Sequence, residues 1–167
     1  MNIVLTGFMG TGKSSVGKRL AEGLGLEYAD TDDLIEARAG MKVRKIFAEK
    51  GEAFFLALEK DVIRDITSGK EGLVLSTGGG AVIDEANRRF LRGWGTVVCL
   101  AASSGTILER VGSGDERPLL DRPDRKAYVE ELLKRREAAY RDCDLLIDTT
   151  KKGVEEVTEE IRRFLFC

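Results

Sequence analysis

Short apolar runs alternate along this chain with longer stretches of helical periodicity. We predict strands at residues 2 to 6, 27 to 29, 73 to 76, 96 to 101 and 145 to 148. We predict helices at about 13 to 24, 33 to 38, 43 to 68, 84 to 92, 104 to 110, 124 to 140 and 153 to 165. This alternation predicts an α/β fold with a mainly parallel sheet. The unbroken apolar run Val97-Val98-Cys99-Leu100 fits a strand that is buried on both faces.

The first predicted strand leads directly into a glycine-rich segment. Residues 7 to 14 read Gly-Phe-Met-Gly-Thr-Gly-Lys-Ser, the GxxxxGKS pattern of a phosphate-binding loop. Glycines let successive backbone N–H groups turn towards phosphate oxygens, Lys13 supplies a positive charge, and Ser14 offers a hydroxyl group to magnesium. The helix predicted from residue 13 adds its positive N-terminal end. A merely flexible glycine loop is the alternative, but the position between a strand and a helix favours a nucleotide-binding protein.

Composition and charge limit the class of ligand. The chain has 167 residues, of which 43% are hydrophobic, and this fits one globular domain with its own core. The net charge is -2 with acidic and basic residues intermixed, so we expect small-molecule ligands and neither a nucleic acid nor a membrane partner. No basic leader precedes the first strand, and the three cysteines are widely spaced. We therefore expect a cytoplasmic protein with free thiols.

Asp30 and Asp32 follow the second predicted strand and are the first candidates for acid–base chemistry. Histidine is absent from the chain, so this chemistry would fall to carboxylates. Strands of a parallel sheet end at one edge, so both aspartates are expected near the phosphate-binding loop. Phosphoryl transfer needs a carboxylate near magnesium and gains from another that orients the attacking hydroxyl group. The same residues also suit capping of the next helix, and both roles stay open.

Two further segments are candidates for binding. Gly78-Gly79-Gly80 follows the third predicted strand, where small residues let the backbone approach a ligand and donate from its amides. A plain turn is the alternative. Residues 111 to 123 contain both prolines of the chain, and we predict a mobile lid there that carries Arg117 over the phosphates. An ordinary surface connection is the alternative.

An arginine on the helix predicted after this lid is a candidate clamp for phosphate or carboxylate, because guanidinium groups bind both with two hydrogen bonds. Arg136 lies on that helix, but spacing alone does not distinguish it from Arg135 or Arg141.

Six motifs in a fixed order resemble shikimate kinase over nearly the whole chain. They are GFMGTGKS from residue 7, DTD at 30 to 32, GEAFF at 51 to 55, TGGG at 77 to 80, RPLL at 117 to 120 and R-x-x-x-Y at 136 to 140. The resemblance implies a three-layer P-loop kinase fold, with helices flanking a five-stranded parallel sheet in the order 2-3-1-4-5. It implies one domain over residues 1 to 167, with the lid at about 111 to 123 and a helical substrate-binding region at about 31 to 60.

The activity that this resemblance implies is transfer of the γ-phosphoryl group of ATP to the 3-hydroxyl group of shikimate, within aromatic amino-acid biosynthesis. The implied catalytic residues are Lys13, Asp32 and Arg117. The implied nucleotide-binding residues are Gly10, Thr11, Gly12, Lys13, Ser14, Ser15, Arg110 and Arg117, with Arg110 stacking on adenine. The implied substrate-binding residues are Asp32, Gly78, Gly79, Gly80 and Arg136. Magnesium is expected at Ser14 and Asp30, and a monomer is expected to suffice.

One position departs from the family pattern. The GEAFF run is followed in the family by an arginine that pairs with the shikimate carboxylate, whereas Leu56 follows it here. A hydrogen bond to a charged group is worth roughly 1.5 to 3 kcal/mol, so its loss would weaken binding about ten- to a hundredfold. We hypothesise that Lys60, one helical turn later, takes the vacated place. Two alternatives stay open: a kinase for another small hydroxy acid or polyol, and an ATP-binding switch that transfers no phosphate.

Overall fold

A single parallel sheet forms the centre of the computed structural model, which describes residues 1–112 and 122–167. Its strands are β1 (Ile3–Thr6), β2 (Glu27–Asp30), β3 (Leu73–Ser76), β4 (Thr96–Ala101) and β5 (Leu145–Asp148). They lie in the order β2-β3-β1-β4-β5, and every neighbouring pair is parallel. This confirms the predicted strands and the predicted order 2-3-1-4-5.

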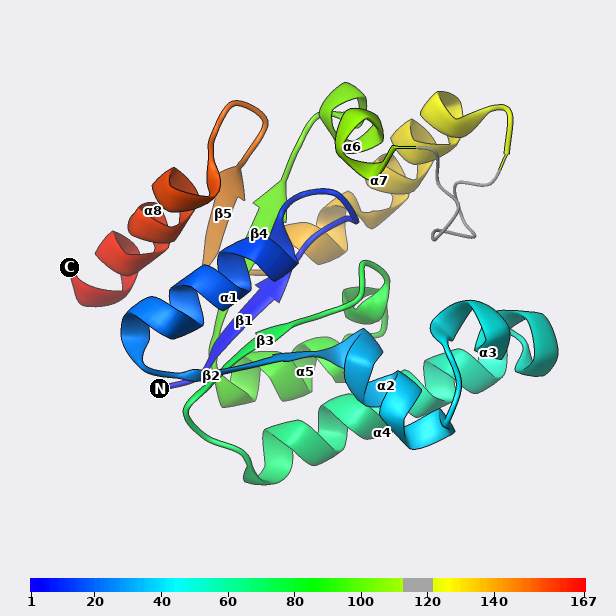
Figure 1. Cartoon of the computed structure of the whole chain (residues 1–167), viewed down its shortest axis with the longest axis horizontal. Helices are drawn as coiled ribbons and strands as arrows, with labels where there is room; N and C mark the ends of the chain where they lie inside the picture. The colour runs from blue at the N-terminus through cyan, green and yellow to red at the C-terminus, as the bar shows by residue number, and fades with distance from the viewer. Residues whose placement is uncertain (113–121) are drawn as a thin grey trace.

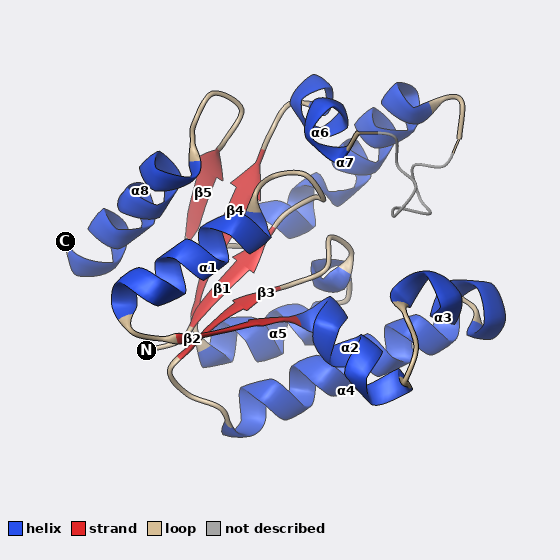
Figure 2. Ribbon diagram, viewed as in Figure 1, coloured by secondary structure: helices blue, strands red, loops and turns tan. Residues whose placement is uncertain are grey.

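Helices cover both faces of the sheet and give the predicted three layers (Figure 2). The helices are α1 (Lys13–Leu24), α2 (Thr31–Ala39), α3 (Val43–Lys50), α4 (Glu52–Gly69), α5 (Glu85–Trp94), α6 (Ser104–Val111), α7 (Arg125–Arg141) and α8 (Val154–Phe166), with a short 3-10 helix η1 (Ala81–Ile83). Successive side chains of a strand point to opposite faces. Accordingly, Ile3 and Leu5 of β1 pack with α1 and α8, whereas Val4 packs with α4, α5 and α7.

The helix predicted over residues 43 to 68 is wrong in one respect, because the structure divides it into α3 and α4. Gly51 separates the two helices with a φ of 85° and a ψ of 169°, a backbone conformation that side-chain-bearing residues rarely adopt. The ring centroids of Phe47 and Phe55 lie 4.6 Å apart across the break. Together with α2, these helices enclose a small apolar cluster beside the sheet, around Ile35 and Ile46.

The parallel arrangement brings several loops together at one edge of the sheet (Figure 1). The phosphate-binding loop follows β1, α2 begins directly after β2, and Gly78–Gly80 follow β3. Thr149 follows β5 at the same edge. Ligands of open α/β sheets bind at this edge. In residues 1–112 and 122–167, no helix combines the length and the apolar character needed to cross a membrane.

Candidate active site at the carboxyl edge of the sheet

The phosphate-binding loop presents its backbone to the start of α1. Gly12 is the N-cap residue of this helix, with a φ of 103°, and no side chain caps the helix there. The first N–H groups of α1 are thus left for a ligand, and an anion is favoured at this positive helix end. The Lys13 ammonium group donates hydrogen bonds of 2.8 Å to the carbonyl groups of Gly7 and Phe8. The loop therefore has the form that the sequence predicts.

Asp30 has one of the two roles that the sequence leaves open, that of a helix cap. One of its carboxylate oxygens accepts a 2.8 Å hydrogen bond from the backbone N–H of Asp32 and caps α2. The other oxygen lies 3.4 Å from the hydroxyl group of Ser14. Burial raises the pKa of Asp30, and the positive charge of Lys13 opposes this rise. One carboxylate therefore caps a helix and also faces the hydroxyl group of the phosphate-binding loop.

Asp32 lies on the first turn of α2 and faces the glycine segment after β3. Burial, together with the neighbouring Asp30 carboxylate, raises the pKa of Asp32 to about 6, although the charge of Lys13 lowers it. A carboxylate with such a pKa is largely ionised at neutral pH and is still basic enough to accept a proton. Asp32 thus has the electrostatic properties of a general base.

The glycine segment is packed closely against charged side chains. A Cβ atom on Gly78 would lie 3.1 Å from the Asp32 carboxylate, and one on Gly79 would lie 3.6 Å from the Arg136 guanidinium group. The backbone N–H of Gly78 donates a 2.9 Å hydrogen bond to the Thr31 hydroxyl group, which fixes the segment to the start of α2. Gly80 has a φ of -93°, an ordinary value, and a Cβ atom there would make only an ordinary contact of 3.6 Å with the Arg136 guanidinium group.

Arg136 is the arginine of α7 that enters the site, which the sequence spacing alone does not decide. Arg135 and Arg141 are exposed and pair with glutamates of their own helix. The Arg136 guanidinium group lies 5.5 Å from the centre of the Phe8 ring in the phosphate-binding loop. Its Nη1 atom lies 3.4 Å from the Tyr140 hydroxyl group.

Tyr140 was part of the R-x-x-x-Y motif but received no role from the sequence. Its buried hydroxyl group donates a 2.6 Å hydrogen bond to the Gly79 carbonyl group. Burial raises the pKa of Tyr140 to about 12, so the hydroxyl group stays protonated as a donor. Tyr140 therefore joins the glycine segment to the helix that carries Arg136.

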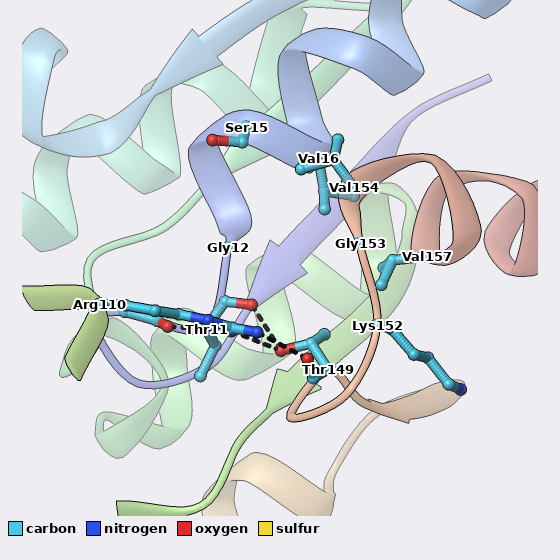
Figure 3. A pocket seen from close by; sticks show the side chains of 11 residues that line it. Thr11, Gly12, Ser15, Val16, Arg110, Thr149, Lys152, Gly153, Val154 and Val157 are labelled. Carbon is cyan, nitrogen blue, oxygen red and sulfur yellow. Dashed lines mark hydrogen bonds between the residues drawn. The ribbon is translucent and has the colours of Figure 1, made fainter. Parts of the chain in front are cut away.

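A cavity of about 370 Å³ lies beside the phosphate-binding loop (Figure 3). Its lining residues come from three parts of the chain: Gly10, Thr11, Gly12, Ser15 and Val16 at the start of α1, Arg110 of α6, and Thr149, Lys152, Gly153, Val154 and Val157 around the start of α8. Apolar walls with a few polar groups suit a planar ring. The predicted nucleotide-binding residues Gly10, Thr11, Gly12, Ser15 and Arg110 thus meet at one cavity.

Thr149 is a residue of this cavity that sequence reasoning missed. Its buried hydroxyl group donates a 2.9 Å hydrogen bond to the Thr11 carbonyl group (Figure 3). Arg110 donates hydrogen bonds to the Thr149 carbonyl group at 2.7 Å and to its hydroxyl group at 3.0 Å. Its place directly after the last predicted strand, at the carboxyl edge, is the signal that points to it.

Glu59 is a second residue that the sequence analysis missed. Its side chain is only 2% exposed, and its Oε2 atom would lie 3.3 Å from a Cβ atom on Gly78. It shares the buried face of α4 with Phe55, Val62 and Ile63. A glutamate in the apolar stripe of a helix is the sequence signal that points to it.

The structure places Lys60 and Leu56 of the predicted substrate region but does not describe the predicted lid residue Arg117. Lys60 forms a 2.8 Å ion pair with Asp84, so its ammonium group is engaged there and not at the place that we assigned to it beside Leu56. The Leu56 side chain is 44% exposed. Arg117 and most of the lid predicted at residues 111 to 123 lie outside the described residues.

Comparisons with known proteins agree with this geometry. A family model described as shikimate kinase matches residues 9–166. The shikimate kinase of Geobacter sulfurreducens is 49% identical over 164 residues, which cover 98% of this chain and 90% of the relative. That of Caldanaerobacter subterraneus is 44% identical over 162 residues, covering 97% of this chain and 94% of the relative.

Solved structures show the same architecture. The shikimate kinase from Acinetobacter baumannii, in complex with shikimate, superposes with a TM-score of 0.94 at 37% identity and covers 98% of this chain and 92% of that chain. The shikimate kinase from Aquifex aeolicus gives a TM-score of 0.84 at 34% identity, covering 99% of this chain and 96% of that chain.

Proposed function

Because the chain belongs to the shikimate kinase family, we propose that it transfers the γ-phosphoryl group of ATP to the 3-hydroxyl group of shikimate. The products are shikimate 3-phosphate and ADP, within the synthesis of chorismate and the aromatic amino acids. The observation that carries this proposal is the convergence of the phosphate-binding loop, Asp32, the glycine segment and Arg136 at one edge of the sheet. Phosphoryl transfer depends mainly on positioning and electrostatic stabilisation, which such a convergence supplies.

Asp32 is the proposed general base. The shikimate hydroxyl oxygen attacks the γ-phosphorus, the bond to the bridging oxygen of ADP breaks, and the hydroxyl proton passes to the Asp32 carboxylate. The pKa of about 6 leaves Asp32 mostly ionised at neutral pH. Lys13 and the N–H groups at the start of α1 stabilise the negative charge on the phosphates. Arg117 is the proposed lid residue that contacts the transferring group.

The substrate is held from two sides in this proposal. Gly78 to Gly80 approach it from the sheet edge, with the N–H groups of Gly79 and Gly80 as donors because that of Gly78 is bonded to Thr31, and Arg136 binds its carboxylate from α7. Arg136 is partly buried and lies 5.5 Å from the Phe8 ring centre, so its guanidinium group is held in one place before the substrate binds. The adenine ring is assigned to the cavity beside Arg110 and Thr149.

Magnesium fits the residues that the sequence assigns to it. The Ser14 hydroxyl group and the second oxygen of Asp30 lie 3.4 Å apart, and both are the hard oxygen ligands that this ion prefers. Bound there, magnesium would neutralise negative charge on the phosphates. Asp30 keeps its other oxygen for the α2 cap, which fixes the orientation of the carboxylate.

Other features of the sequence analysis remain part of the proposal. We expect a single domain over residues 1 to 167, with the lid at about 111 to 123 and the substrate-binding region at about 31 to 60. We expect a monomer in the cytoplasm, and analytical ultracentrifugation with and without both substrates is the measurement that tests the oligomeric state.

The direct test is steady-state phosphoryl transfer from Mg-ATP to shikimate, in the wild type and in Leu56→Arg. If Leu56 weakens the carboxylate site, the arginine variant lowers the KM for shikimate about ten- to a hundredfold, because a hydrogen bond to a charged group is worth roughly 1.5 to 3 kcal/mol. Leu56→Gln is the control, since it adds polar atoms without the charge, on a shorter side chain. The KM for ATP is expected to stay unchanged in both variants.

The other outcomes separate the alternatives. Turnover of a different hydroxy acid or polyol, with none of shikimate, would show that shikimate is not the acceptor. Tight ATP binding without turnover of any acceptor, in the wild type and in Leu56→Arg, would show that the protein binds ATP and transfers no phosphoryl group.

A further inference from the structure

Glu59 is a buried carboxyl group that the proposed reaction does not use. It lies on α4 and is 2% exposed, and its neighbours on the same buried helix face are apolar. Buried carboxyl groups need a paired cation, hydrogen bonds or a bound proton, because an isolated buried charge is very costly. The groups that surround Glu59 decide which of these applies.

Charged groups face Glu59 from several elements. A Cβ atom added to Gly78 would lie 3.1 Å from Asp32 Oδ1 and 3.3 Å from Glu59 Oε2. The carboxyl groups of Asp32 on α2 and Glu59 on α4 therefore both lie next to Gly78. Arg136 of α7 opposes the negative charge of Glu59, and Asp84, the N-cap residue of α5, adds to it. Lys13 opposes the charge of Asp32. Glu59 therefore depends on the charge of Arg136, which the proposed reaction also needs for the substrate.

The cations of α4 do not supply the missing charge. Lys60 is the residue after Glu59, but its ammonium group pairs with Asp84 at 2.8 Å. Arg64 pairs with Asp61 and Asp65 on the exposed side of the helix. Leu56 lies three residues before Glu59, a spacing that places side chains next to each other on a helix. At this neighbouring position the chain has an apolar side chain that cannot pair with Glu59.

Protonation of one carboxyl group is the remaining way to balance these charges. Two carboxyl groups that share a site do not both ionise readily. Burial, followed by the charge of Asp32, raises the pKa of Glu59 to about 8, although Arg136 lowers it. Glu59 is buried whereas Asp32 is only partly buried, so the proton stays on Glu59 and Asp32 is the ionised partner at neutral pH.

Building on the proposed function, we infer that Glu59 is a positioning residue that works as an uncharged acid, so that Asp32 alone accepts the substrate proton and Arg136 stays available to the substrate carboxylate. Ionisation of Glu59 in alkaline solution would place a second negative charge beside an anionic substrate and would draw on the charge of Arg136. The consequence is that the affinity for shikimate is coupled to the protonation of Glu59.

The kinetic test is the KM for shikimate as a function of pH. For the wild type we expect a constant KM below about pH 7 and a rise approaching tenfold per pH unit above about pH 8, because one proton is lost. Glu59→Ala is expected to raise the KM for shikimate at every pH. Glu59→Gln keeps an uncharged group of the same size, so it is expected to restore most of the affinity for shikimate. This variant is also expected to lack the rise in KM at alkaline pH. The KM for Mg-ATP serves as the internal control.

Leu56→Arg provides a second test, because it adds a cation near Glu59 and leaves the carboxyl group in place. An arginine three residues before Glu59 can pair with it on the same helix face, which lowers the pKa of Glu59 and allows it to ionise without harm to the substrate site. The alkaline rise in KM is expected to disappear in this variant too. A wild-type KM that is constant from pH 6 to pH 9, or Glu59→Gln as impaired as Glu59→Ala, would overturn the inference.

Infrared spectroscopy tests the protonation without any activity. The wild type at neutral pH is expected to show the carbonyl band of a protonated carboxyl group, which disappears as the pH rises through about 8 and is missing in Glu59→Gln. Absence of this band from the wild type at neutral pH would refute an uncharged Glu59. If the band is present but no shikimate is turned over at any pH, the proposed function fails while the protonation of Glu59 stands.

Discussion

Glu59→Gln should change how the stability of the protein depends on pH. Burial raises the pKa of Glu59 from 4.5 to about 8, which corresponds to a free energy of up to about 5 kcal/mol. Between these two values the folded chain holds a proton that the unfolded chain has lost. The contribution of this proton to stability is therefore complete below about pH 4.5 and is lost as the pH rises through about 8. Glutamine does not titrate, so the variant lacks this loss.

The assay is urea unfolding, followed by circular dichroism at several values between about pH 5 and pH 9. The free energy of unfolding of the wild type, minus that of Glu59→Gln, is expected to fall between about pH 5 and pH 8 and to level off above about pH 8. Glu52→Gln is a matched control, because it changes an exposed glutamate at the start of the same helix. A difference between wild type and Glu59→Gln that stays constant with pH would refute an uncharged Glu59.

Three other substitutions test the packing of the site and of the sheet. Gly78→Ala inserts a Cβ atom 3.1 Å from a carboxylate oxygen, and we expect the KM for shikimate to rise at least about tenfold with little change in the KM for ATP; equal effects on both would contradict this. Tyr140→Phe leaves the Gly79 carbonyl group without its 2.6 Å donor, and urea unfolding should show a loss of about 1 to 3 kcal/mol. Gly17→Ala would place a Cβ atom 2.6 Å from the Tyr28 ring, so we expect about 1 to 3 kcal/mol of destabilisation, and a more stable variant would show that the ring moves freely.

The sequence predicts most of the fold because the central strands of the sheet are marked by unbroken apolar runs. Runs such as residues 73 to 76 and 96 to 101 become strands within a residue of the expected ends. The long helix over residues 43 to 68 was wrong because helical periodicity continues through Gly51, and only the backbone conformation there shows the break. A single glycine within a periodic stretch does not by itself distinguish a tolerated residue from a helix end.

The candidate site was predictable where motifs follow strands and less so where it depends on packing. Asp32 and the glycine segment were found because both come directly after a strand. Glu59 and Thr149 were missed because their roles come from neighbours that are distant in sequence. Arg136 needed the structure as well, because only the rotation of α7 against the sheet makes Arg136 partly buried and leaves Arg135 and Arg141 exposed.

The hydrogen bond from Thr149 to Thr11 also has a consequence for how the protein is made. It joins residues that lie 138 positions apart in the chain, and Thr149 also fixes Arg110 beside the same loop. During synthesis the N-terminal residues leave the ribosome first. The phosphate-binding loop is therefore among the first segments to emerge, but its hydrogen bond to Thr149 forms only after the last strand. A nascent chain that ends before β5 carries the whole GxxxxGKS motif with the Lys13 contacts inside the loop but without this link to the far end of the sheet.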